Sequence, residues 1–275
     1  YFQEGRTGQA YALISMVMMS LFCQVLIVLG QNKKKSRSEK LREIFFVVTF
    51  LKPALDAYRV ATGHEDKQLS VSPLAEMSAS KGVELATESI PGNVLQIYVF
   101  ITNPTRSTLH LVSILISTMT TAFASAVISF DMDASPDQRK KIPDFYGFMR
   151  DSNFERSATF VVMFLLAGLH NLSKSIGVAL LLAVSGQTTL LVLAGEMIAY
   201  HLVRLLRRDY TTSTPGLEGG LKVIGAFVAH TLFKTALDFT GLIHLRGPKL
   251  SGGVMFLVLT IEAQVLPFVA FEIYK

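Results

Sequence analysis

The chain has a single cysteine among its 275 residues, and it has no tryptophan. Because a disulfide joins two cysteines, Cys23 cannot build a disulfide framework within this chain, and a zinc site made of several cysteines is excluded as well. Any aromatic belt at a membrane interface has to be made by tyrosine and phenylalanine. A lone cysteine leaves the redox compartment open.

Charge is also scarce. Only 17% of the residues are charged, whereas 50% are hydrophobic and the mean hydropathy is +0.42. A soluble domain of this length normally carries a larger charged fraction on its surface. The composition is typical of an integral membrane protein.

Several motifs that carry chemistry are missing. The sequence contains no G-x-x-x-x-G-K-[ST] phosphate loop, no G-x-S-x-G elbow and no H-E-x-x-H pair, so ATP-driven pumping and the common hydrolase chemistries are not expected. The segment "DMDASPD" has some of the acidic spacing of a calcium loop but lacks its glycine and its closing glutamate. No basic face with stacking aromatics indicates nucleic acid. We therefore expect no chemical catalysis, cofactor, metal or nucleic-acid partner.

Long apolar runs are the main feature that is present. Runs near the 20 residues or so that cross a bilayer indicate full spans. They cover Ala10–Gly30, Leu109–Phe130, Phe160–Ser185, Leu190–Leu206, Leu221–Ile243 and Val254–Ile273. Two further runs, Ile44–Val60 and Val83–Ile101, are shorter or are interrupted by proline. The sequence thus predicts an all-α, polytopic membrane protein over residues 1–275, a single domain with about six full spans and two broken or re-entrant helices.

Basic residues are distributed unevenly between the connecting loops. If loop 31–42 is cytoplasmic and both broken helices return to their side of origin, segments 31–42, 62–81, 131–156 and 204–222 share one side. These segments hold 17 of the 26 lysines and arginines, whereas the opposite side holds four. The positive-inside rule places the richer side in the cytoplasm. We therefore predict that loops 31–42 and 131–156 face the cytoplasm, with the plasma membrane as the expected location.

Ionisable side chains inside the apolar runs are the candidate functional residues. Each costs roughly 2.5–3.5 kcal/mol at the centre of a spanning helix, so each needs a reason to be there. The candidates are Glu84, Glu88, His170, Lys174, Glu196, Lys234 and Asp238. They could have a role in transport or could equally be structural; the histidines are more typical of hydrogen-bonded core residues than of metal ligands.

Spacing suggests partners for some of these charges. Lys234 and Asp238 lie four residues apart, and this spacing also suits a structural ion pair. Glu88 and Lys174 are both expected deep in the membrane on different helices, where a lone charge of either sign is costly. We therefore expect Lys174 to pair with Glu88, with Glu84 and Glu196 as alternatives.

Pro91-Gly92 interrupts the apolar run that begins at Val83. Proline has no N–H to donate and disfavours helical backbone in the residue before it. The sequence therefore predicts a kink or unwinding over residues 89–93, within protein or beside water.

Four segments resemble the XK-related family of membrane proteins. "VELATESIPGNVLQIYVFI" (83–101) fits the family pattern E-x-x-x-E-S-[VIA]-P-x-x-x-L-Q-x-Y. "FFVVTFLKPALDAYRVATG" (45–63), "TTAFASAVISFDMD" (120–133) and "FLLAGLHNLSKSIGVALLL" (164–182) resemble other family helices in order and spacing. The resemblance covers about Tyr11 to Ser185. It departs at Lys174, where the family commonly has arginine, and we expect that the family's first helix and C-terminal tail are not in this chain.

The resemblance implies two pseudo-repeated halves, each with a broken helix, and a phospholipid scramblase that needs no ATP. Its partners would be phospholipids and possible cytoplasmic accessory proteins. In that interpretation Glu84, Glu88 and Lys174 line or stabilise a polar stripe for lipid headgroups. Two alternatives remain open. The chain could be a non-catalytic membrane anchor that docks a lipid-transfer protein or another cytoplasmic partner, or it could be an ion channel or solute transporter.

Overall fold

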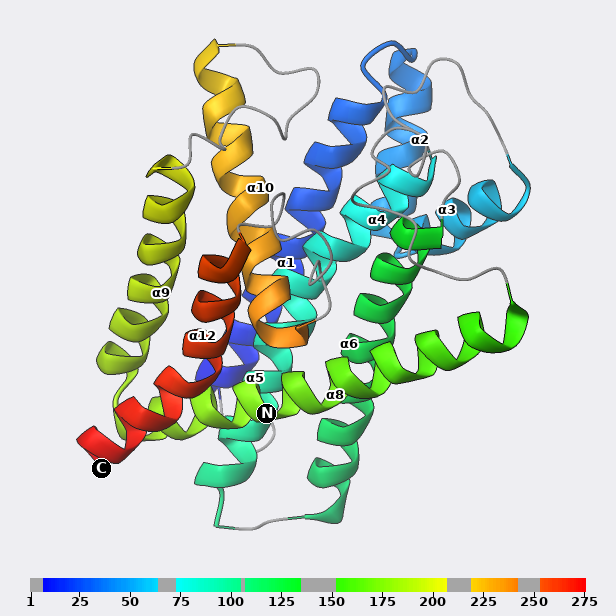
Figure 1. The fold of residues 1–275 in the computed structure, drawn as a ribbon. Coiled ribbons are helices and arrows are strands. Elements are labelled where there is room, and N and C mark those ends of the chain that lie inside the picture. The colour runs from blue at the N-terminus through cyan, green and yellow to red at the C-terminus, as the bar shows by residue number, and fades with distance from the viewer. Residues whose placement is uncertain (1–6, 64–72, 105–106, 135–151, 207–218, 242–252) are drawn as a thin grey trace. The chain divides into compact units, whose positions relative to one another are not determined.

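The computed structural model describes residues 7–63, 73–104, 107–134, 152–206, 219–241 and 253–275, and every regular element in these ranges is a helix (Figure 1). The helices are α1 (Thr7–Gln31), α2 (Arg37–Val48), α3 (Lys52–Ala61), α4 (Pro73–Glu84), the π-helical turn η1 (Leu85–Ser89), α5 (Ile90–Thr102), α6 (Thr108–Ala134), α8 (Asn153–Val184), α9 (Gly186–Leu206), α10 (Gly219–Thr240) and α12 (Gly253–Tyr274). The predicted all-α class is confirmed for this part of the chain. Most of the predicted cytoplasmic loop 131–156 lies outside the described residues.

Four of these helices are long and apolar enough to cross a membrane, namely α1, α6, α8 and α9. Their exposed side chains include large apolar ones such as Phe22 on α1, Leu169 on α8 and Leu190 on α9, which are 60–69% exposed. Apolar side chains facing outward are what a bilayer requires of a protein surface. Helices α10 and α12, where the sequence predicts two further spans, have 22 residues each. The multi-pass membrane interpretation is thus supported, while the number of six spans stays a prediction.

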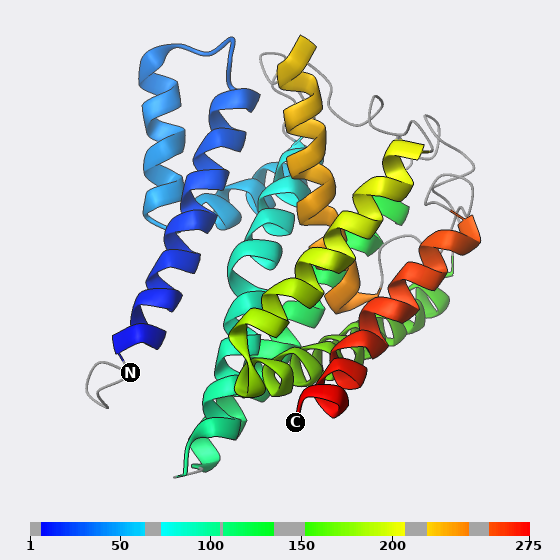
Figure 2. The same ribbon diagram turned by 90° about the vertical axis from the view of Figure 1, so that its left-hand side faces the viewer.

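The chain divides into two compact units, Tyr1–Pro91 and Gly92–Lys275. In the first unit α1 packs against α2, α4 and η1, and α3 packs against α4. Figure 2 shows α1 and α2 side by side, joined by a short connection. Helix α2 begins after Ser36, whose hydroxyl accepts a hydrogen bond from the backbone N–H of Glu39, while the Glu39 carboxylate accepts one from the backbone N–H of Ser36. This capping box fixes where α2 starts.

The predicted broken segment Ile44–Val60 is two helices, α2 and α3, separated by a turn. The break lies at Thr49–Leu51, directly before Lys52-Pro53, where the sequence placed the interruption. Phe50 has a φ of 59°, a left-handed conformation that is uncommon for a residue with a side chain. Pro53 lies in the first turn of α3, where no intrahelical partner for its missing N–H is needed.

Residues 89–93 are not unwound, because α4, η1 and α5 follow one another without a non-helical residue, while the alternative of a kink stays a prediction. The disturbance takes another form and lies one turn earlier. In η1 the backbone N–H of Ile90 donates to the carbonyl of Leu85, which is five residues back instead of four. Since Pro91 cannot donate to the carbonyl four residues before it, a wider turn is a way to enter α5 without breaking the helix.

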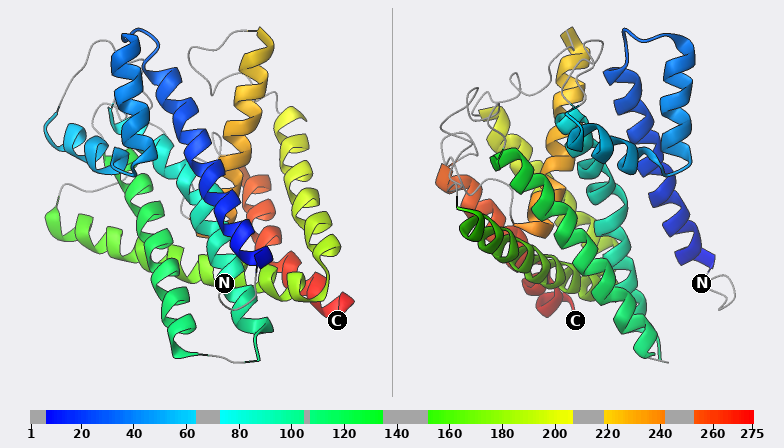
Figure 3. Two further views of the ribbon diagram at one scale, coloured as in Figure 1. Left: turned by 180° about the vertical axis from the view of Figure 1, so that it is seen from behind. Right: turned by 90° about the vertical axis from the view of Figure 1, so that its right-hand side faces the viewer.

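In the second unit α8 is the central helix, in contact with α6, α9, α10 and α12. Figure 3 shows α8 lying crosswise to α6. Close packing depends on small residues: a Cβ added at Gly168 would lie 3.6 Å from the Cβ of Ala122, and one at Gly177 would lie 2.9 Å from the ring of Phe268. Such small residues allow helices to approach closely in membranes, where association depends on packing.

Candidate functional site

A buried ion pair in the second unit connects α8 to α9. The ammonium of Lys174, which is fully buried, lies 2.9 Å and 3.0 Å from the two carboxylate oxygens of Glu196. The same ammonium donates to the backbone carbonyl of Ala263 on α12. Lys174 thus pairs with Glu196, which is one of the two alternatives to the expected partner Glu88. Glu88 belongs to the other unit.

A second buried pair lies within α10, where Lys234 and Asp238 form an ion pair at the spacing of four that suggested it. The side-chain amide of Gln264 on α12 donates to the backbone carbonyl of Asp238 at 2.7 Å. Both charged side chains are at most 6% exposed. The pair thus fits the structural interpretation and also contributes to the contact between α10 and α12.

His170 lies on α8, next to the end of α10. If Gly241 carried a Cβ, that atom would lie 2.8 Å from Nδ1 of the imidazole, and Gly241 has a φ of +65°. Glycine is therefore required there for its backbone conformation and for space. The Nε2 atom of His170 is buried with no hydrogen bond in the described part of the chain. Within those residues no group of three or more His, Cys, Asp or Glu side chains is placed to hold a metal ion.

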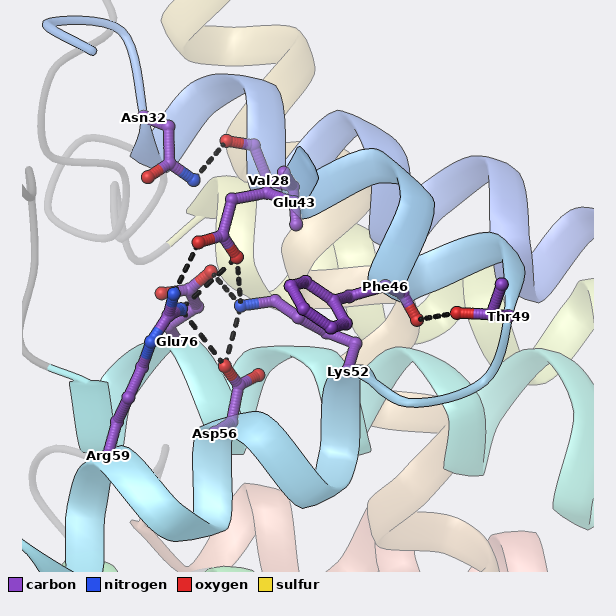
Figure 4. Close-up of polar contacts among 9 residues, drawn as sticks. All are labelled: Val28, Asn32, Glu43, Phe46, Thr49, Lys52, Asp56, Arg59 and Glu76. Atoms are coloured by element: carbon purple, nitrogen blue, oxygen red, sulfur yellow. Dashed lines mark hydrogen bonds and ion pairs between the residues drawn. The ribbon is translucent and has the colours of Figure 1, made fainter. Parts of the chain in front are cut away.

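The sequence did not predict a cluster of five charged residues that the first unit buries between α2, α3 and α4 (Figure 4). The members are Glu43, Lys52, Asp56, Arg59 and Glu76, each at most 9% exposed. The ammonium of Lys52 lies 2.6 Å from Asp56, 2.7 Å from Glu76 and 3.3 Å from Glu43. Arg59 donates to both carboxylate oxygens of Glu43 and lies 3.6 Å from Asp56. With three carboxylates and two cations, these described residues have a formal charge of −1.

Part of this cluster has a signal in the sequence. Lys52, Asp56 and Arg59 lie at spacings of four and three inside an apolar run, which puts them on one helix face. By itself, Lys52-Pro53 indicates only a helix interruption. Glu43 and Glu76 lie on α2 and α4, and no local spacing connects either of them to Lys52.

Glu84 and Glu88 are different from all these charges. Both are only partly buried, and they lie at the end of α4 and within η1. Neither carboxylate makes a hydrogen bond or an ion pair with the residues that the structure describes. The hydroxyl of the intervening Thr87 donates to the backbone carbonyl of Val83, so it is not available to them. Among the described residues the first unit therefore has two partly accessible carboxylates without an ion pair, close to Pro91 and Gly92, and Lys81, three residues before Glu84, attracts it without contact.

These helices and charges define a multi-pass helical membrane protein with ionisable groups gathered inside each unit. No protein-family model, curated protein or solved structure matches the chain. The resemblance to the XK-related family therefore depends on the sequence segments alone.

Proposed function

We propose that this protein is a phospholipid scramblase of the XK-related type, with six spans and two pseudo-repeated halves, which lets lipids exchange between leaflets without ATP. The observation that carries the proposal is that Glu84 and Glu88 make no hydrogen bond and no ion pair with the residues that the structure describes. Every other buried acid discussed above has a cation beside it. A carboxylate in a membrane-embedded helix is costly unless water or a positive group reaches it.

The ligand that suits these carboxylates is the ammonium group of a zwitterionic headgroup, such as choline or ethanolamine. A headgroup cannot cross hydrocarbon without losing its hydration, so it needs polar groups along its route while its acyl chains remain in lipid. Glu84 and Glu88 lie on one helix face at a π-helical turn, and such turns are frequent at functional sites. Lys174 and Glu196, which are buried and paired with each other, stabilise the second unit in this account and do not bind the headgroup.

A docking subunit is the second candidate, because the Lys174, Lys234 and Lys52 ion pairs are closed to solvent and need no functional explanation. Reconstitution separates the two functions. Purified protein in vesicles that carry a fluorescent phospholipid in both leaflets should expose nearly all of that lipid to an impermeant quencher if it scrambles. About half should stay protected in protein-free vesicles and in vesicles with a docking subunit.

Loop 31–42 is cytoplasmic in this proposal. With Cys23 replaced by serine, a cysteine at Ser36 should react in intact cells only with membrane-permeant reagents. Reaction with an impermeant reagent would show that this loop faces the outside of the cell.

A further inference from the structure

A dense group of basic residues follows the first candidate span directly. The connection between α1 and α2 and the first turns of α2 contain Lys33, Lys34, Lys35, Arg37, Lys40 and Arg42. The only acid in residues 31–42 is Glu39. Its carboxylate is occupied by the Ser36 backbone and hydroxyl at 2.9 Å and 2.6 Å. The local excess of positive charge is therefore large.

The folded structure holds this group in place and turns much of it outward. Lys33, Lys34, Arg37 and Arg42 are exposed. The ammonium of Lys40 donates to the backbone carbonyl of Lys33 at 3.0 Å, which connects α2 back to the end of α1. This order distinguishes the group from a disordered basic tail.

The same helix exposes an apolar stripe beyond its basic end. Leu41, Phe45 and Val48 recur at spacings of four and three and are 55–66% exposed. At the turn that follows, Phe50 and Leu51 are 62% and 50% exposed. A helix with a basic end and an exposed apolar side suits the boundary between headgroups and acyl chains.

We propose that residues 33–51, the basic segment, bind anionic phospholipids. The exposed lysines and arginines contact the negative headgroups, while the apolar stripe and turn lie among the upper acyl chains. Clusters of four to eight basic residues next to a span attract acidic lipids of the cytoplasmic leaflet. The rule that positive loops stay inside explains the charge but not the exposed apolar stripe joined to it. The inference does not depend on scrambling.

The absence of tryptophan allows a direct test. Phe45→Trp places a single tryptophan on the exposed stripe, and the full chain is reconstituted into phosphatidylcholine vesicles. Two vesicle preparations are compared, in which a minor fraction of the lipid is brominated phosphatidylserine or brominated phosphatidylcholine. Bromine quenches the tryptophan fluorescence, so the stronger quencher is the lipid that lies more often beside the tryptophan. We expect phosphatidylserine to be preferred about five-fold, the factor that one basic group near an anionic surface contributes. The preference should fall when salt is raised from about 0.05 M to about 0.5 M.

Matched variants locate the effect. Arg37→Gln with Arg42→Gln should reduce the preference to less than about two-fold. Arg156→Gln with Lys275→Gln removes the same charge from the second unit and should leave it unchanged. A tryptophan at Phe22, within α1, should show no preference. Equal quenching by both lipids at position 45, or a preference that is independent of salt, would overturn the inference, and neither result requires the charge variants to fold.

Discussion

The ammonium of Lys174 and the carboxylate of Glu196 form an ion pair with N–O distances of 2.9 Å and 3.0 Å, and this pair joins α8 to α9 inside the second unit. Lys174 is 0% exposed and Glu196 is 7% exposed. Because neither charge can turn to water without opening the helices, each depends on the other.

Removing one member of this pair should therefore be much worse than removing both. Lys174→Met leaves Glu196 buried without a cation, and we expect a loss of about 3–5 kcal/mol in stability. Adding Glu196→Met should recover most of the loss, since a buried pair replaced by apolar groups is often close to neutral. Thermal unfolding of the purified protein in detergent measures both. If Lys174→Met is as stable as the parent, the pair is not a structural element.

In the charged cluster of the first unit, removing a cation should destabilise the protein more than removing a carboxylate, because its formal charge is −1. Lys52→Met removes the cation that contacts three carboxylates and should cost at least about 3–5 kcal/mol. Asp56→Asn removes the excess charge and retains an oxygen that can accept from Lys52. We therefore expect this variant to lose only about 1–3 kcal/mol of stability, the effect of weakening one buried hydrogen bond. The same unfolding measurement compares them. Asp56→Asn as damaging as Lys52→Met would show that the excess charge is balanced by another group.

Gly241 should tolerate no side chain. Its N–H donates to the carbonyl of Leu237 at 2.8 Å, which ends α10 in the left-handed conformation, and the His170 ring fills the space beside it. Gly241→Ala should cost at least about 1–2 kcal/mol from the backbone alone. Gly195→Ala is the control, because nothing lies within 4 Å of its added Cβ and it lies inside a helix. That variant should be neutral or stabilised by up to about 1 kcal/mol, and equal melting temperatures of the two variants would contradict the packing.

The capping box of α2 should depend on pH. Hydrogen bonds from the Ser36 hydroxyl and backbone N–H lower the pKa of Glu39. A lowered carboxyl pKa adds stability above the ordinary pKa, and this stability is lost as pH falls through the lowered value. The protection of the amides at the start of α2, measured relative to their intrinsic exchange rates at each pH, should therefore fall in acid. Ser36→Ala should cost about 1 kcal/mol locally and weaken this pH dependence, because only the backbone N–H at position 36 then donates to Glu39. Ser38→Ala should retain the pH dependence, and protection that does not change with pH would refute the box.

The sequence predicted what composition and local spacing determine. Apolar runs predict the long helices, and the spacing of four predicts the Lys234–Asp238 pair. Most of α4 and the start of α2 lie in segments 62–81 and 31–42, which the sequence predicts as loops. Pro91 predicts a disturbance, and the chain has a wider π-helical turn directly before it but continues as a helix, because the adjusted hydrogen-bond pattern avoids unpaired backbone groups.

Partners on different helices could not be predicted in this way. Lys174 had several acids as candidates, and only packing of α8 against α9 selects Glu196. The contact of Lys52 with Glu76 needs α3 and α4 to fold together, and the segment between these helices gives no pattern that implies it. Hydrophobic periodicity shows which face is buried, but it does not show which buried charge meets which.

The central claim is that the carboxylates of Glu84 and Glu88, which have no ion pair among the described residues, attract lipid headgroups. The rate of lipid exchange in reconstituted vesicles tests this claim most directly. Glu84→Gln with Glu88→Gln should leave the protein folded, because no ion pair within the described residues is broken, and should slow exchange by at least about ten-fold, the effect of about 1.4 kcal/mol on the barrier. Glu84→Asp with Glu88→Asp keeps the charges and should retain most of the rate. Exchange that is as fast in the glutamine variant as in the parent, or no exchange by the parent at all, would contradict the account.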